Sequence, residues 1–310
     1  MRDIFVARLT ELAAADPRIM LVTGDLGFGV LTHFATTFPR QYVNAGVAEQ
    51  NMTGIATGLA LSGRVVFTYS IANFTTLRCL EQIRNDAAYH DANVTVVSVG
   101  GGFSYGALGM SHHATEDLAI MRALPIRVVA PCDDWEAREI VKPLVDAPGT
   151  KYLRLDKSTP GDTSRPGETF ALGAARRMRD GDALTIVTTG GILELVLRAV
   201  DRHADAGLRC RVLAIHSIKP MDRDALIAAA RETGGVITVE EHTIEGGLGG
   251  AVAETLLDSG VFPRRFHRIG LRAGFSSIVG SQSYLRRAYG LDEADIHRAI
   301  AELAASPVSR

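Results

Sequence analysis

The stretch Asn44-Ala-Gly-Val-Ala-Glu-Gln-Asn-Met-Thr-Gly-Ile-Ala-Thr-Gly58 predicts a helix with an acid, Glu49, in its first turn. Apolar residues recur after Glu49 at helical spacing, at Met52, Ile55, Ala56, Leu59 and Ala60. Gly54 and Gly58 lie on one side of this helix, where each costs about 1 kcal/mol relative to alanine. The two glycines therefore suggest that another backbone approaches closely, as it would at a subunit interface. Glu49 alone also has a structural explanation, because an acid at a helix N-terminus complements the helix dipole.

Outward from this helix, short β-branched runs alternate with helix-length segments. We expect strands at 19–23, 65–69, 94–99 and 128–130, which together predict a buried parallel sheet with helices on both faces. A second α/β unit follows, with strands expected at 184–188, 211–215 and 236–240. Its helices are expected at 193–203, 223–231 and 250–258.

The length of 310 residues also favours two domains, because a single core rarely grows beyond about 250–300 residues. The segment 157–170, KSTPGDTSRPGETF, supports no periodic element. We therefore predict a first domain at 1–157, a linker at 158–172 and a second domain at 173–310.

The composition excludes several classes of protein. The net charge of -2 and the aromatic content of 6% give no footprint for nucleic-acid binding. The N-terminus does not resemble a signal peptide, and no apolar run is long enough to span a membrane. The 3 cysteines have no metal-type spacing and leave one thiol over after any intramolecular pairing. These features favour a reducing, cytoplasmic setting.

Two segments resemble the transketolase family. The stretch around Glu49 resembles its pyrimidine-binding signature, and Ser111-His-His-Ala-Thr-Glu-Asp-Leu-Ala-Ile-Met-Arg-Ala-Leu-Pro125 resembles a second landmark. The resemblance covers nearly the whole chain. It implies a parallel-sheet domain that binds the pyrimidine of thiamine diphosphate, followed by a transketolase C-terminal domain.

The resemblance also implies the role of Glu49, which is to hydrogen-bond nitrogen N1′ of the pyrimidine. A proton shared with N1′ favours the imino form of the neighbouring 4′-amino group, which can then take the C2 proton of the thiazolium. Gly24-Asp-Leu resembles the family's own Gly-Asp at the start of this domain and places Asp25 near the cofactor.

The stretch Phe67-Thr-Tyr-Ser-Ile-Ala-Asn-Phe-Thr-Thr-Leu-Arg78 falls where transketolases place aromatic rings against the pyrimidine. The resemblance implies Phe74 as the stacking partner and Tyr69 as the second choice. Thr75 and Ala72 stand where the family often has phenylalanine, so a core position for Phe74 stays open. The following polar residues match the family and are expected to hold the next helix and the subunit contact: Arg78, Glu81 and Gln82.

The loop Gly100-Gly-Gly-Phe-Ser-Tyr-Gly-Ala-Leu-Gly109 follows a predicted strand and would let backbone approach a ligand. Beyond it, His112 matches a family position with His or Gln beside the cofactor's amino group, which makes it the second expected catalytic residue. His113 is the fallback and a candidate substrate ligand. A structural role for the pair of histidines is the alternative.

Transketolases hold the diphosphate through a divalent metal bound by Gly-Asp-Gly and a later Asn-Asn, and this chain contains neither motif. The chain therefore resembles the C-terminal subunit of a split transketolase. The resemblance implies no metal ligand in this chain and Mg²⁺ held by a separate N-terminal, diphosphate-binding subunit. Sites between subunits imply self-association and an α2β2 assembly.

The substrate pocket matches the family only in part. Arg2 and Lys157 match phosphate-binding positions, although lysine lacks the fork of an arginine. Gly29 replaces a phosphate-binding serine, Leu108 replaces an aspartate that contacts sugar hydroxyls, and Gly100 falls near a usual histidine. We therefore expect a sugar phosphate or a related substrate, with a donor or acceptor that can differ from the usual pentose and hexose phosphates.

The run Val239-Glu-Glu-His-Thr-Ile-Glu-Gly-Gly-Leu-Gly249 in the second unit combines acids with a Gly-rich turn. Such turns can bind ligands, but this domain of the family mainly supports the dimer. We therefore favour a structural role for Glu240, Glu241 and His242.

Three other functions stay open. The E1 β subunit of a 2-oxo acid dehydrogenase has similar size and domain order, but it usually lacks the acidic continuation after His112-His113. A deoxyxylulose phosphate synthase-like reaction is possible, although that family keeps both halves on one chain. A noncatalytic assembly subunit is the third alternative, against which the presence of Glu49 weighs.

Overall fold

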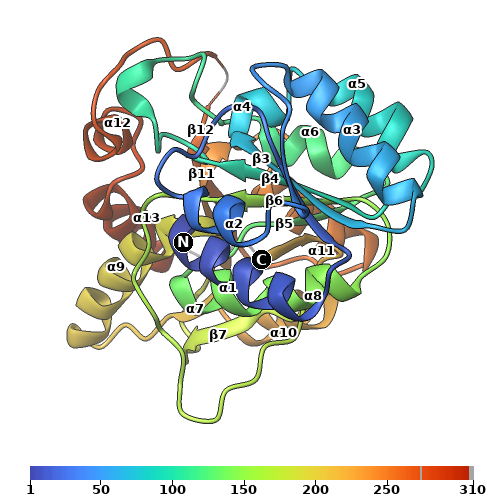
Figure 1. The fold of residues 1–310 in the computed structure, drawn as a ribbon. Coiled ribbons are helices and arrows are strands. Elements are labelled where there is room, and N and C mark those ends of the chain that lie inside the picture. Colours follow the sequence, from blue (N-terminus) through green and yellow to red (C-terminus); the bar gives the residue numbers. More distant parts are fainter. Residues whose placement is uncertain (273, 307–310) are drawn as a thin grey trace.

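The computed structural model describes residues 1–272 and 274–306, which form two α/β units with one sheet each (Figure 1). The predicted second domain extends over residues 273 and 307–310, which lie outside this description. The two-unit α/β fold expected from the sequence is confirmed.

The first sheet has seven strands in the order β10-β5-β6-β4-β3-β1-β2. Its strands are β1 (Ile19–Thr23), β2 (Tyr42–Asn44), β3 (Val65–Ile71), β4 (Val94–Val99), β5 (Arg127–Val129), β6 (Lys151–Leu155) and β10 (Ser217–Lys219). All neighbouring pairs among the six strands β1 to β6 are parallel. The prediction that this sheet is wholly parallel is nevertheless wrong. Strand β10 comes from the second half of the chain and pairs antiparallel with β5.

Helices cover both faces of this sheet, as Figure 1 shows. The helical elements of this half are α1 (Arg2–Ala15), α2 (Thr32–Thr37), α3 (Glu49–Leu61), α4 (Ala72–Thr75), α5 (Leu80–Gln82), the π-helical turn η1 (Ile83–Ala88), the 3-10 turn η2 (Gly106–Leu108) beside α12 (Gln282–Ala288), α6 (Asp117–Ala123), α7 (Asp134–Glu139) and α8 (Val141–Asp146). Strand side chains alternate between two cores: Leu21 and Leu153 pack in the core of α1, while Val22 and Tyr152 pack in the core of α3. This alternation explains why the strands read as continuous apolar runs.

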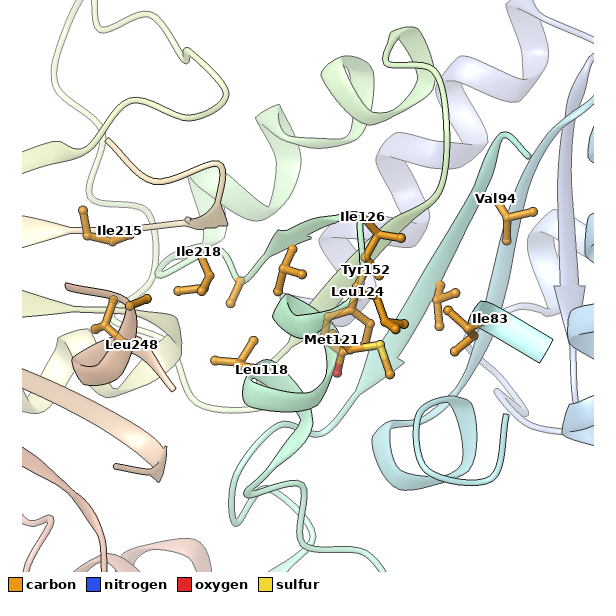
Figure 2. Close-up of a cluster of buried hydrophobic side chains, with 14 of the residues drawn as sticks. Ile83, Val94, Leu118, Met121, Leu124, Ile126, Tyr152, Ile215, Ile218 and Leu248 are labelled. Atoms are coloured by element: carbon orange, nitrogen blue, oxygen red, sulfur yellow. The ribbon is translucent and has the colours of Figure 1, made fainter. Parts of the chain in front are cut away.

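The core that contains α3 continues from the first sheet into the second unit. Figure 2 shows Leu118 and Met121 of α6 between Tyr152 of β6 and two residues of the second half, Ile218 and Leu248. All five side chains belong to one buried cluster. The two units therefore share a core.

The second sheet has five strands in the order β12-β11-β8-β9-β7. Its strands are β7 (Arg176–Arg179), β8 (Thr185–Thr188), β9 (Arg211–Ala214), β11 (Val236–Thr243) and β12 (Phe266–Leu271). The helical elements of this half are η3 (Gly190–Ile192), α9 (Leu193–Asp205), α10 (Arg223–Glu232), α11 (Leu248–Asp258), α12 (Gln282–Ala288) and α13 (Glu293–Ala305). The expected strands and helices of this unit are all present, but β7 runs antiparallel to β9.

The segment predicted as a linker contains no helix or strand between β6 and β7. It is nevertheless fixed to both units: Arg176 at the start of β7 bonds Asp133 at 2.7 Å and Glu168 at 2.9 Å. Phe170 packs against Trp135 and His216. The domain boundaries themselves stay a prediction.

Candidate functional site

The candidate site lies where the carboxyl ends of the parallel strands meet. Strands β1, β3, β4 and β6 are neighbours in one sheet, so the segments that follow them gather at one edge. Seven of the eight residues predicted from the sequence belong to these segments, to the start of α3 or to the start of α1: Arg2, Asp25, Glu49, Phe74, His112, His113 and Lys157. Tyr69 lies within β3, near its end.

Glu49 is the first residue of α3, and its side chain is only 3% exposed. Its Oε2 accepts a hydrogen bond from Nη1 of Arg78 at 2.7 Å. Among the described residues, no group hydrogen-bonds Oε1. A Cβ on Gly24 would lie 3.2 Å from Cγ of Glu49, so a glycine leaves room for this carboxylate. The result is a buried acid with one oxygen available.

Phe74 is linked to this acid through Arg78 and lies outside the buried cores. Its ring is partly exposed, the Arg78 guanidinium lies 4.4 Å from its centroid, and the His112 ring packs edge-on at 5.1 Å. A partly exposed ring at the mouth of a buried acid favours the stacking role over the core position.

His112 and His113 have different surroundings. His112 is partly exposed, its Nδ1 lies 3.0 Å from Oγ of Ser111, and Nε2 has no partner among the described residues. Burial, and then the neighbouring His113, lower the pKa of His112, which favours the neutral ring. This ring can therefore accept or donate a proton through Nε2.

The ring of His113 points into the protein and uses both nitrogens. Nδ1 lies 2.6 Å from Oγ of Ser276, and Nε2 lies 3.0 Å from the carbonyl oxygen of Gly106. The side chain is buried and packs edge-on against Phe103 at 5.2 Å. The structure therefore gives no support to the expectation that His113 binds substrate, because its hydrogen-bonding capacity is already satisfied.

Asp25 and Tyr69 lie on the side of the site next to β1. Asp25 has a φ of 56°, a strained conformation for a residue other than glycine, and the Asn44 amide holds its Oδ1 at 2.9 Å. Tyr69 is 3% exposed, and burial raises its pKa. Its Cε1 lies 3.2 Å from the position a Cβ on Gly27 would take. Tyr69 therefore forms a wall behind the loop that carries Asp25.

One of the two predicted phosphate ligands lies near a tyrosine to which the sequence pattern assigns no role. The Lys157 ammonium lies 4.8 Å from the centroid of the Tyr105 ring. The pKa of Arg2 is raised, mainly by the hydrogen bond that its Nε donates to Asp3. Tyr105 could have been found from its position in the Gly-rich loop, which follows β4.

Glu240, Glu241 and His242 are buried and bonded within the protein. Glu240 accepts the backbone N–H groups of Leu248 and Gly249 at the start of α11. His242 accepts the N–H of Leu118 at 3.1 Å, and Glu241 bonds Arg286 at 2.5 Å. These contacts agree with a structural role: those of Glu240 and of Arg286 lie within the second unit, while His242 joins that unit to α6.

In the described part of the chain, no group of three or more His, Cys, Asp or Glu side chains could hold a metal ion. No helix there is long and apolar enough to cross a membrane.

Comparison with protein families gives two matches. A model described as "Transketolase, pyrimidine binding domain" matches residues 1–161. A second model, "Transketolase, C-terminal domain", matches residues 173–296.

Individual relatives extend this similarity. A subunit of the apulose-4-phosphate transketolase of Phocaeicola vulgatus is 41% identical over 298 residues, 95% of this chain and 94% of that protein. The 6-deoxy-6-sulfo-D-fructose transketolase subunit SqwH of a Clostridium species is 34% identical over 305 residues, 98% and 94% of the two chains. A solved structure named "Split gene transketolase, inactive beta4 tetramer" has a TM-score of 0.88 and 34% identity, and the match covers 100% of this chain and 98% of that one.

Proposed function

We propose that this chain, which belongs to the transketolase family, is the pyrimidine-binding subunit of a split transketolase that moves a two-carbon ketol unit from a ketose to an aldose. The chain is a transketolase-type transferase subunit, as the two family matches and the named relatives indicate. The observation that carries the proposal is the buried carboxylate of Glu49, which keeps one oxygen free beside a partly exposed ring.

The residues present fit the pyrimidine half of thiamine diphosphate. Oε1 of Glu49 is available to hold a proton at N1′, because only Oε2 is used by Arg78. Phe74 has a partly exposed ring with Arg78 over one face, and the aminopyrimidine is proposed to stack on the other face. Nε2 of His112 is free to exchange a proton at the amino group or at a substrate oxygen. When bound, thiamine diphosphate supplies the nucleophilic carbon that carries the ketol unit.

The diphosphate half of the cofactor is proposed to be held by another polypeptide. The sequence lacks the metal-binding motifs of the family, and the described residues offer no metal cluster. We propose that a separate diphosphate-binding subunit supplies Mg²⁺ and its ligands. The relative named an inactive beta4 tetramer supports this, since that assembly of one kind of subunit lacks activity.

An α2β2 assembly follows from sites that lie between subunits. The beta4 tetramer of the relative supports self-association of this subunit. Cys79, Cys132 and Cys210 are buried and free, which supports the cytoplasm as the location of the complex.

The substrate is proposed to carry an acidic group. One relative is named for apulose-4-phosphate and another for 6-deoxy-6-sulfo-D-fructose, so phosphate and sulfonate groups both occur among these substrates. Arg2 and Lys157 supply the positive charge that either group needs.

The test is reconstitution with the diphosphate-binding subunit, thiamine diphosphate and Mg²⁺, followed by a screen of ketose donors and aldose acceptors. The chain alone should be inactive, and the complex should transfer a ketol unit. Glu49→Gln should reduce turnover by at least about 100-fold, as expected when a group used in the transition state is lost. The matched control is Glu302→Gln, an exposed acid on α13, which should keep full activity.

Two outcomes would contradict the proposal. Decarboxylation of a 2-oxo acid without ketol transfer would identify an E1 β subunit instead. Full activity of a complex that contains Glu49→Gln would indicate that this chain is a noncatalytic assembly subunit.

A further inference from the structure

Tyr105 occupies a position that no side chain at residue 100 could share. A Cβ added to Gly100 would lie 2.1 Å from Cε2 of Tyr105 and 2.3 Å from Cδ2. Gly100 also has a φ of +91°, which disfavours any other residue. The ring of Tyr105 therefore fills the space beside the end of β4.

The same ring connects the reacting end of the site to its cationic end. The His112 ring lies 6.5 Å from the Tyr105 centroid, and the Lys157 ammonium lies 4.8 Å from it. A row of neighbouring side chains thus runs from Glu49 through Arg78, Phe74 and His112 to Tyr105, with Lys157 at its far end.

The loop that carries Tyr105 is held on both sides. The N–H of Phe103 donates to Oε1 of Glu241 at 2.5 Å, and the carbonyl of Gly106 accepts from the N–H of Gly280 at 3.2 Å. The Lys157 N–H donates to Oγ of Ser104 at 3.2 Å. The ring is therefore presented by a fixed backbone.

The Lys157 side chain, by contrast, has few restraints. It is exposed, and among the described residues its ammonium group makes no hydrogen bond and no ion pair. A lysine is a flexible point charge, and only contact with its surroundings can orient it. The face of the Tyr105 ring supplies that contact, at a distance within the range of cation–π attraction.

We propose that Tyr105 is a positioning residue that sets the preference of this site for substrates with a terminal phosphate or sulfonate. It does so by holding the Lys157 ammonium against its ring, which also lies next to the His112 ring. The inference rests on the proposed function and names the substrate class of that site. It predicts that binding of the terminal phosphate or sulfonate depends on Tyr105, whereas the reaction at the substrate's carbon atoms does not.

The experiment compares Tyr105→Phe and Tyr105→Leu in the reconstituted complex. Glyceraldehyde 3-phosphate, glyceraldehyde and a sulfonated acceptor of the same length serve as acceptors. Tyr105→Leu should raise KM for the two anionic acceptors about 3- to 10-fold, the range of a partly exposed cation–π contact, with kcat unchanged. KM for glyceraldehyde should not change. Tyr105→Phe keeps the ring and should behave like the unmodified protein.

A double variant tests whether Tyr105 acts through Lys157. In the Lys157→Gln background, Tyr105→Leu should add no further rise in KM, because the two residues share one interaction. Tyr89→Leu is the control for loss of a tyrosine ring, since Tyr89 is 84% exposed at the end of η1. Equal changes in KM for anionic and neutral acceptors, or an additive effect in the Lys157→Gln background, would overturn the inference.

A second measurement separates this inference from the proposed function. Inorganic phosphate should raise the melting temperature of the isolated chain more than chloride at equal ionic strength, and Tyr105→Leu should remove the difference. If the complex shows no ketol transfer but this difference depends on Tyr105, the proposed function fails and the anion site stands. If ketol transfer occurs but neither the KM ratio nor the phosphate effect depends on Tyr105, the inference fails alone. A phosphate response without a sulfonate preference would assign the site to phosphate.

Discussion

Nη1 of Arg78 lies 2.7 Å from Oε2 of Glu49 and joins the turn after α4 to the first residue of α3. The carboxylate is buried, whereas the Arg78 side chain is 45% exposed. The same guanidinium lies over the Phe74 ring. Arg78 therefore fixes both groups that are proposed to contact the pyrimidine, and it leaves Oε1 of Glu49 free.

Arg78→Ala should weaken binding of thiamine diphosphate to the reconstituted complex by roughly 10-fold or more, because a hydrogen bond to a charged group contributes about 1.5–3 kcal/mol. Arg78→Lys should recover part of this loss, since it keeps the charge without the fork. Titration of the complex with cofactor would measure both. The control is Arg40→Ala, because Arg40 is exposed. An unchanged affinity for the cofactor in Arg78→Ala would show that Glu49 does not need the Arg78 hydrogen bond.

His112 and His113 should respond differently to the same substitution. His112→Asn should lower kcat at an unchanged melting temperature, because its free Nε2 belongs to the site. His113→Asn should lower the melting temperature, because Ser276 and Gly106 lose their partner. Turnover and thermal unfolding measured on both variants would decide, and the reverse result would move the reacting role to His113.

Arg154→Leu should destabilise the chain by about 3–5 kcal/mol, since it leaves two buried carboxylates without their counterion. Arg154 lies 2.9 Å from Oδ1 of Asp156 and 3.2 Å from Oδ1 of Asp117, and it also donates to the carbonyl of Glu241. Denaturant unfolding would measure the loss. Arg287→Leu is the control, because Arg287 is 75% exposed and should change stability by less than about 0.5 kcal/mol.

His242 should make stability depend on pH on the acid side. Burial lowers its pKa to about 4, and its Nε2 accepts the N–H groups of Leu118 and Ala119, which requires an unprotonated nitrogen. Between about pH 6.5 and about pH 4, His242 is protonated in the unfolded chain and unprotonated in the folded chain. The free energy of unfolding therefore falls as the pH drops through this range. The full effect is on the order of 3 kcal/mol.

Glu240 acts in the opposite direction, because burial raises its pKa to about 7 and its Oε2 lies 3.6 Å from Nδ1 of His242. The measurement therefore compares Glu240→Gln with Glu240→Gln/His242→Asn. Of the two, only Glu240→Gln, which keeps His242, should lose stability as the pH falls from about 6.5 to about 4. Parallel curves for the two proteins would refute the assignment.

The sequence predicted most of the framework because its signals are local. β-branched runs at β1, β3 and β4 and the periodic helix after Glu49 indicated both the α/β class and the position of the acid. Strands β2, β6, β7, β10 and β12 were not predicted. For the edge strand β10, three residues carry little periodicity, and its antiparallel pairing with β5 crosses from one unit to the other.

The sequence by itself determined that an acid begins a helix at Glu49 and that neither metal motif of the family is present, because both depend on residues adjacent in the chain. Only the tertiary structure decided which histidine is free and what surrounds Lys157. His113 is satisfied by Ser276, far along the chain, and Tyr105 meets Lys157 only because the parallel order places β4 beside β6. Contacts between distant segments depend on strand order and packing, and neither can be predicted from the spacing of residues along the chain.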